Sequence, residues 1–156
     1  MIKTIPFAIM VLLFLSMSNN TGEPETLKWY SWDEGYEKGK KTNKIILIDM
    51  YTDWCGWCKR MDRDTYAKQE IIKIINKDFI AIKFNPEKPF TYDVDGTKVN
   101  GRQLAGLLAN NRSVGYASTF FLFPKSKKIF LESGYQDASR FQNTLNKYRE
   151  LKKQED

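Results

Sequence analysis

Two cysteines separated by two residues are the side chains of this sequence whose type and spacing indicate redox chemistry. Cys55 and Cys58 enclose Gly56 and Trp57, and at this spacing one helical turn brings two sulfur atoms within bonding range. The pair can therefore close into a disulfide and reopen without a large backbone movement. The chain contains no other cysteine, so neither thiol serves a structural disulfide framework.

An apolar, β-branched run with one acid inside it leads into the cysteine pair. The run from Ile45 to Met50 predicts a strand that is buried on both faces, with Asp49 set inside it. Cys55 then lies at a strand-to-helix turn, where free amide groups and the helix dipole stabilise an anion. Such settings lower the pKa of a thiol from about 8.5 to about 3.5–7.5. We therefore expect Cys55 to be the exposed nucleophilic thiol and Cys58 the buried resolving thiol.

The segment around the cysteine pair resembles the active-site segment of thioredoxin-like proteins, which is an aliphatic strand with a buried Asp followed by Trp-Cys-Gly-x-Cys-Lys. The resemblance implies an α/β fold, a thioredoxin-like three-layer sandwich in which helices flank a central mixed β-sheet. It also implies a thiol-disulfide oxidoreductase that needs no cofactor, with a redox-active disulfide between the two cysteines. The residues that carry it are Asp49, Asp53, Trp54, Cys55, Gly56, Trp57, Cys58 and Lys59.

Two charged residues outside the cysteine pair are candidates for the chemistry. Burial in an apolar strand should raise the pKa of Asp49, which would suit this residue to accept the proton of Cys58 directly or through a water. The alternative is an acid at the strand end that faces solvent. Lys83 stands where thioredoxin-like proteins carry a lysine that approaches the buried Asp, and its charge would oppose the rise in pKa. The alternative here is a solvent-facing strand lysine.

The residues expected to contact substrate flank the cysteines or follow the loop that faces them. Trp54 and Trp57 form either an apolar lip for substrate or one core and one surface aromatic. The family carries a cis-proline before the Thr of the facing strand, where this chain has Ser118 or, in a shifted alignment, Ala117. A cis bond before a residue other than proline costs about 2.5–4 kcal/mol, so we expect a trans or strained loop. The predicted substrate-binding residues are Trp54, Gly56, Trp57, Ala117, Ser118 and Thr119.

Hydrophobic periodicity and turn residues predict the elements that would position these side chains. The first helix follows a cap at Ser31 or Asp33, and the helix after the loop buries Leu104, Leu107 and Leu108. The expected elements are a helix ending near 41, helices over about 56–64 and 68–76 with a break at Thr65, a strand over 79–85, a loop or hairpin over 86–100 that turns at Asp95-Gly96, a helix over 101–111, strands over 119–123 and 127–133, and a terminal helix over about 139–152.

The first twenty residues have the parts of a secretory signal peptide: a cation at Lys3, an apolar core from Ile5 to Leu15 and the small residues Ser16 and Ser18. The apolar run is about half of the roughly 20 residues that span a bilayer. We therefore expect cleavage rather than a retained membrane anchor. The predicted organisation is a signal peptide over 1–20 and one thioredoxin-like domain over 21–156, exported and periplasmic if the source is bacterial.

Charge and composition argue against several other classes of protein. The net charge of +6 is spread along the chain, which indicates a solvated surface rather than a nucleic-acid site. A zinc site needs about four ligands, and two cysteines with no histidine do not supply them. The absence of histidine also argues against Cys–His hydrolysis. We therefore expect no metal, no cofactor and no nucleic-acid partner.

These features predict a protein-disulfide reductase for exported proteins that carry disulfides. Its electrons would come from a donor redox protein, membrane-bound or periplasmic. The reducing direction follows because Asp53 disfavours a thiolate at Cys55 and no histidine stands between the cysteines, whereas Lys59 and Arg60 act weakly in the other direction. The alternatives are a disulfide oxidase or isomerase, or a non-catalytic thioredoxin-fold binding or chaperone module. The missing proline and the long 86–100 segment slightly favour the non-catalytic module, whereas the intact set of Asp49, Trp54, Cys55, Cys58 and Lys83 disfavours it.

Overall fold

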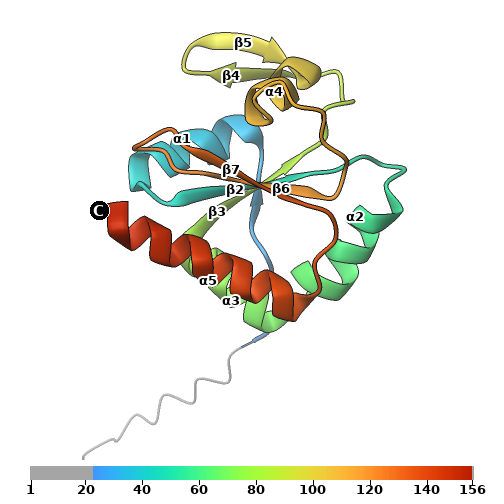
Figure 1. Cartoon of the computed structure of the whole chain (residues 1–156), viewed down its shortest axis with the longest axis vertical. Coiled ribbons are helices and arrows are strands. Elements are labelled where there is room, and N and C mark those ends of the chain that lie inside the picture. The colour runs from blue at the N-terminus through green and yellow to red at the C-terminus, as the bar shows by residue number, and fades with distance from the viewer. Residues whose placement is uncertain (1–22, 156) are drawn as a thin grey trace, which may run out of the picture.

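A five-stranded mixed sheet lies at the centre of the computed structural model, which describes residues 23–155 (Figure 1). The strand order is β1-β3-β2-β6-β7. β1, β3 and β2 run parallel, whereas β6 is antiparallel to β2 and β7 is antiparallel to β6. The predicted signal peptide lies outside the described residues. The strands are β1 Trp29–Tyr30, β2 Ile45–Met50, β3 Phe79–Phe84, β6 Ser118–Leu122 and β7 Ile129–Ser133.

Helices cover both faces of this sheet and complete the predicted three layers (Figure 1). One face is covered by α1 and α4, and the other by α2, α3, α5 and the π-helical turn η1, which continues α2. No helix among residues 23–155 combines the length and apolarity that crossing a membrane requires. The helices are α1 Trp32–Thr42, α2 Gly56–Met61, η1 Asp62–Tyr66, α3 Gln69–Asp78, α4 Gly101–Leu108 and α5 Ala138–Glu155.

The central strand β2 is buried along its whole length, as the sequence predicts. Successive side chains of a strand point to opposite faces, and here Ile46 and Ile48 enter the core beneath α1 and α4. Ile45 and Leu47 enter the core beneath α3 and α5. Asp49 shares the face of Ile45 and Leu47, so its carboxylate lies on the side of the sheet that α2 and η1 cover.

The predicted loop or hairpin after β3 is a separate two-stranded hairpin of β4 Thr91–Val94 and β5 Thr97–Asn100. Asp95 and Gly96 form its turn with φ angles of 51° and 88°. Two central residues with positive φ match the twist of a tight hairpin, which is why Asp-Gly predicts this turn.

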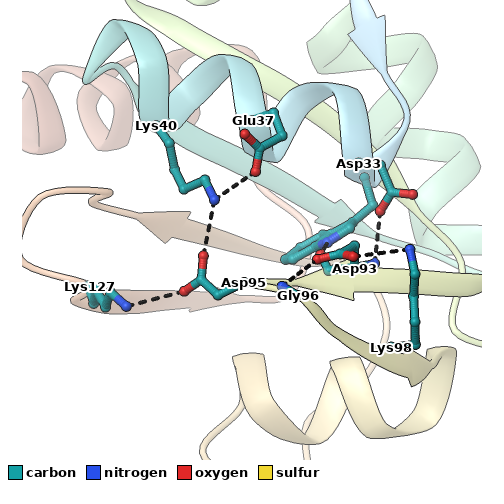
Figure 2. Close-up of polar contacts among 9 residues, drawn as sticks. Asp33, Glu37, Lys40, Asp93, Asp95, Gly96, Lys98 and Lys127 are labelled. Atoms are coloured by element: carbon teal, nitrogen blue, oxygen red, sulfur yellow. Dashed lines mark hydrogen bonds and ion pairs between the residues drawn. The ribbon is translucent and has the colours of Figure 1, made fainter.

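Polar contacts fix this hairpin to α1 and to the β6–β7 connection (Figure 2). The indole N–H of Trp32 donates to the backbone oxygen of Asp93 at 2.7 Å. The ammonium groups of Lys40 and Lys127 contact the two carboxylate oxygens of Asp95 at 3.0 and 3.1 Å. The hairpin is therefore held at its tip from two sides.

Three predicted helix boundaries are wrong, and one of them is the end of α5, which runs to Glu155 rather than to about residue 152. α2 ends at Met61 and continues as η1 to Tyr66, because the buried Thr65 hydroxyl donates to the backbone oxygen of Gln136 at 2.6 Å and the chain does not break there. α4 ends at Leu108 rather than at residue 111, because Asn110 and Asn111 both adopt left-handed φ angles, which end a helix.

The inward position predicted for Leu107 is also wrong. Its side chain is 52% exposed, whereas Leu104 and Leu108 are buried as predicted. Leu104 and Leu108 are four residues apart and share one face of α4, and Leu107 lies at the margin of that face.

α1 approaches the sheet closely because glycines stand on its inner face. A Cβ atom at Gly39 would overlap the side chain of Ile46, and one at Gly35 would lie 2.5 Å from Cγ1 of Ile82. Both isoleucines are fully buried. The helix therefore has no room for a methyl group at either position.

We expect Gly39→Ala to lower the free energy of unfolding by about 1–3 kcal/mol, the usual cost of overpacking a core. This loss would appear although alanine favours a helix by about 1 kcal/mol over glycine. Denaturant unfolding measures the difference. Gly106→Ala in α4 is the matched control, because its Cβ would meet only the end of the Asn111 side chain at 3.1 Å. A Gly39→Ala protein as stable as the control would contradict this packing.

Candidate active site

Cys55 and Cys58 form a disulfide at the start of α2, with their Cα atoms 5.3 Å apart. Cys55 is the N-cap residue of this helix, and the backbone N–H of Cys58 donates to Sγ of Cys55 at 3.1 Å. The helix thus begins at the sulfur of Cys55, as predicted. This amide group is positioned to stabilise a thiolate at Cys55 when the disulfide opens.

The predicted difference in exposure between the two sulfurs is wrong for the disulfide state. Cys55 is 6% exposed and Cys58 is 3% exposed. Ala117 is buried against both cysteines, and the rings of Tyr51 and Tyr116 pack around this cluster. The assignment of Cys55 as nucleophile therefore rests on its place at the helix start and not on its exposure.

The loop that faces the disulfide adopts a strained trans conformation, as the missing proline predicts. All peptide bonds of residues 23–155 are trans, and Ala117 has a φ of 62°. The left-handed region costs a residue with a side chain about 1–2 kcal/mol. The hydroxyl of Ser118 donates to the backbone oxygen of Gly115 at 2.7 Å and closes the loop. Thr119, the next residue, pairs with Asp49 between β6 and β2.

A buried carboxylate lies on the α2 side of the sheet. Asp49 is 2% exposed, and its Oδ2 accepts a hydrogen bond from Nζ of Lys83 at 2.6 Å. The hydroxyl of Tyr66 lies 3.3 Å from Oδ1 of Asp49 and 3.3 Å from Oγ1 of Thr119. Burial raises the pKa of Asp49, and the charge of Lys83 only partly offsets this rise. The solvent-facing alternatives for Asp49 and Lys83 are therefore excluded.

The ammonium group of Lys83 is held by a second carboxylate and by aromatic rings. Its Nζ also donates to Oδ1 of Asp62, an exposed residue of η1. The same nitrogen lies 4.9, 5.0 and 5.4 Å from the ring centroids of Trp29, Tyr51 and Tyr66. Rings at these distances attract a cation. Lys83 thus links the buried Asp49 to a carboxylate at the surface.

Sequence reasoning missed Asp62 and Tyr66 as parts of this group. The sequence predicts a helix that ends at Asp64 and a break at Thr65. With that break, nothing indicates that the side chain of Tyr66 reaches Asp49. The π-helical turn over Asp62–Tyr66 carries the chain round so that both side chains reach the Asp49–Lys83 pair. Such turns are frequent at functional sites, but nothing in the sequence pattern marks this one.

The two tryptophans of the motif are both on the surface, which excludes the alternative of one core and one surface aromatic. Trp54 is 66% exposed and Trp57 is 57% exposed. Trp54 meets Tyr116 edge-on with centroids 5.1 Å apart, and Trp57 lies 5.6 Å from Tyr135. The guanidinium of Arg60 lies over Trp57 and Tyr135. Each tryptophan of the motif is therefore part of a separate aromatic pair.

The segment after β3 also reaches the motif, a contact that the sequence did not reveal. The indole N–H of Trp54 donates to the carboxylate of Glu87 at 3.0 Å. Nζ of Lys88 lies 2.6 Å from Oδ2 of Asp53. The hydrogen bond from Lys88 lowers the pKa of Asp53. The ammonium group also offsets the negative charge that Asp53 would otherwise direct at Cys55.

The assembled groups are suited to thiol-disulfide exchange. They comprise a closed cysteine pair at a helix start, a buried carboxylate of raised pKa and an exposed aromatic surface. Residues 23–155 contain no cluster of three or more His, Cys, Asp or Glu side chains that could hold a metal ion. The described residues thus bring a cysteine pair and a buried carboxylate to the same side of the sheet, as nucleophilic and general-base catalysis by thiols would need.

Solved structures of similar shape have the thioredoxin fold. A thioredoxin from Thermus thermophilus is 16% identical, with a TM-score of 0.62 over 80% of this chain and 88% of that chain. A structure named DsbH oxidoreductase is 19% identical, with a TM-score of 0.59 over 79% of this chain and 84% of that chain. These likenesses confirm the predicted thioredoxin-like fold.

Relatives by sequence connect the chain to a family. An uncharacterized protein of Caenorhabditis elegans is 31% identical over 100 residues, which are 63% of this chain and 13% of that protein. The chain thus spans about an eighth of the length of that relative. Residues 17–154 match the family model Thioredox_DsbH, described as a protein of unknown function, DUF255. The chain therefore belongs to this DsbH-like family of thioredoxin-fold proteins, in which it carries a Cys-x-x-Cys disulfide.

Proposed function

We propose that this protein is a thiol-disulfide oxidoreductase that reduces disulfides in exported proteins. The observation that supports this function most is the Cys55–Cys58 disulfide at the start of α2 together with the buried Asp49–Lys83 pair on the same side of the sheet. A structural disulfide would need neither a helix start at one sulfur nor a buried carboxylate nearby. Both features serve a pair that opens and closes.

The reaction begins with the reduced protein. The Cys55 thiolate attacks one sulfur of the substrate disulfide, whose S–S bond breaks, and the substrate thiolate released takes up a proton. Cys58 then gives its proton to Asp49 and attacks Sγ of Cys55. This step forms the Cys55–Cys58 disulfide and releases the second substrate thiolate, which is protonated in turn. Two electrons pass from the dithiol to the substrate, and a donor redox protein with a reduced dithiol restores the starting state.

The Asp49 carboxylate has the properties of a proton acceptor for Cys58. Its raised pKa brings its proton affinity closer to the working pH range, where general bases are effective. Lys83 bridges this buried acid to the exposed Asp62. Asp62 is a positioning residue in this scheme, because it acts on Asp49 through Lys83 and its own charge rather than on the sulfurs.

The reducing direction rests mainly on Asp49. A negative charge on the face of the sheet that α2 covers disfavours thiolates in the cysteine pair, and a less stable reduced form makes the protein a stronger reductant. Asp53 contributes less than its sequence position indicates, because Lys88 neutralises it. On the other side of the motif, the cation Arg60 is committed to Asp64 and therefore adds little stabilisation at Cys55. The partners are disulfide-bearing exported proteins and an electron donor that is membrane-bound or periplasmic.

A second candidate is a non-catalytic thioredoxin-fold binding module. The burial of both cysteines and the absence of a proline beside them favour it. In that case dithiothreitol would open the disulfide slowly or not at all under native conditions, and the reduced protein would not accelerate the reduction of insulin.

We expect a reduction potential below about −200 mV, on the reducing side of the thioredoxin-like range. Equilibration of the purified protein with glutathione and dithiothreitol buffers, followed by quantification of free thiols, measures it. A value near −120 mV, typical of a strong oxidant, would instead support a disulfide oxidase.

We expect Cys58→Ser to accumulate mixed disulfides with substrate proteins, because Cys55 can still attack and nothing resolves the adduct. Cys55→Ser should accumulate almost none. Non-reducing gels after acid trapping compare the two variants. Equal trapping by both variants, or preferential trapping through Cys58, would reverse the assigned roles of the sulfurs.

We expect Asp62→Asn to move the acidic limb of the pH–rate profile to lower pH. The negative charge of Asp62 raises the pKa of Asp49, so its removal should let Asp49 ionise, and accept the Cys58 proton, at lower pH. Insulin reduction with a phosphine as electron source gives the profile. Glu70→Gln is the matched control, because Glu70 is exposed in α3 and is not among the carboxylates that pair with Lys83. If the acidic limb of the pH–rate profile stays at the same pH or moves to higher pH in Asp62→Asn, Asp62 does not influence proton transfer to Asp49.

A further inference from the structure

A surface hollow of about 420 Å³ adjoins the redox centre on the Trp54 side. Tyr116 belongs to both places, because its ring lines the hollow and also packs against the cluster formed by Cys55, Cys58 and Ala117. The same ring meets Trp54 edge-on. The hollow is therefore continuous with the aromatic surface that a disulfide substrate must cross.

The lining of this hollow is cationic. It includes the side chains of Arg102 and Arg112 and no carboxylate. Among the described residues, Arg60, Arg63 and Arg149 form ion pairs, whereas Arg102 and Arg112 form none. Arg112 donates from Nε to the backbone oxygen of Ala109 at 3.2 Å, which leaves its two terminal nitrogens for a ligand.

The acids on this side of the motif are already engaged. Asp53 is paired with Lys88, and Glu87 accepts the hydrogen bond of the Trp54 indole and does not line the hollow. Burial and then the charge of Glu87 raise the pKa of the Tyr116 phenol, and the charge of Arg102 partly offsets this rise. The guanidinium charge of Arg102 thus acts on Tyr116, the residue that joins the hollow to the aromatic surface.

The two sides of the motif differ in whether their arginines form ion pairs. On the Trp57 side, Arg60 is stacked between two rings and paired with Asp64. On the Trp54 side, the cations Arg102 and Arg112 are uncommitted. An anionic group would therefore gain more on the Trp54 side, and guanidinium groups are well suited to bind it because their paired N–H groups match a carboxylate.

We propose that this hollow is a carboxylate subsite that selects protein disulfides with an acidic residue beside the cysteine. The substrate chain crosses Tyr116 and Trp54 while its acidic side chain enters the hollow. The subsite rests on the proposed function, because it positions the same disulfide for attack by Cys55. The exchange of electrons and protons is unchanged.

Two synthetic disulfide peptides test the subsite, identical except for Glu or Gln at the positions that flank one cysteine. The measured quantity is the second-order rate constant for oxidation of the reduced full-chain protein by each peptide. We expect the Glu peptide to react about fivefold faster at low salt, the scale of one exposed ion pair. This ratio should fall toward one as added salt screens the charges.

Arg102→Gln should bring the ratio of the two rate constants close to one, and Arg102→Lys should restore part of it. Lys41→Gln is the control for net charge. Lys41 is exposed at the end of α1, and this end lies at the start of β2, whereas the cysteines follow the other end of that strand. The control should keep the ratio of the unaltered protein. A ratio near one in the unaltered protein, or the same ratio in Arg102→Gln, would overturn the subsite.

Binding of redox-inert peptides separates the subsite from the proposed function. Calorimetry with the Glu and Gln peptides, each with its cysteines replaced by serine, should show tighter binding of the Glu form that is lost in Arg102→Gln. If the protein fails to exchange with either disulfide peptide but keeps this preference, the reductase function fails and the carboxylate site stands. Equal binding of the two inert peptides would remove the site whatever the redox activity.

Discussion

The carboxylate of Asp49 is buried in the central strand, and the surrounding structure supplies what this burial requires. An isolated charge in a protein interior is strongly unfavourable unless it is paired and hydrogen-bonded. The parallel register of β2 and β3 sets Lys83 directly beside Asp49, and Tyr66 approaches the second oxygen. β1 contributes Trp29 beside the ammonium group. The neighbouring strands β3 and β1 thus supply the residues that stabilise the buried charge of Asp49 and Lys83.

The parts of this arrangement that follow from local pattern could be predicted from the sequence. The apolar run of β2, the helix start at Cys55 and the Asp-Gly hairpin turn each depend on a few consecutive residues. The approach of Lys83 to Asp49 could be predicted only from the resemblance to thioredoxin-like proteins. Tyr66 and Asp62 were missed, because their position depends on a π-helical turn held by a contact between Thr65 and Gln136, which are 71 residues apart. A contact over such a sequence distance leaves no local signal.

The burial of Cys55 illustrates the same limit. A helix start predicts that Cys55 can stabilise an anion, but it does not predict which residues bury Cys55. Here the loop before β6 buries it. Ala117 takes a left-handed conformation, which places it against both cysteines. The strain of about 1–2 kcal/mol is offset by the fully buried strand β6 that follows and by the contact between Ser118 and Gly115. Ser118 or, in a shifted alignment, Ala117 is the residue at which the resemblance to thioredoxin-like proteins would place a cis-proline.

The segment between β3 and α4 gives the redox surface two unlike sides. Its hairpin is fixed to α1 by Trp32 and at its tip by Lys40 and Lys127, and the residues that precede the hairpin contact the cysteine motif. Among those residues, Glu87 accepts the hydrogen bond of the Trp54 indole and Lys88 forms an ion pair with Asp53. The carboxylates on this side of the motif therefore contact groups other than Arg102 and Arg112. The nearby arginines of the α4 region are left without carboxylate partners. Because opposite charges steer association more than they add affinity, we expect the proposed carboxylate subsite to act mainly on the approach of a disulfide substrate to Cys55.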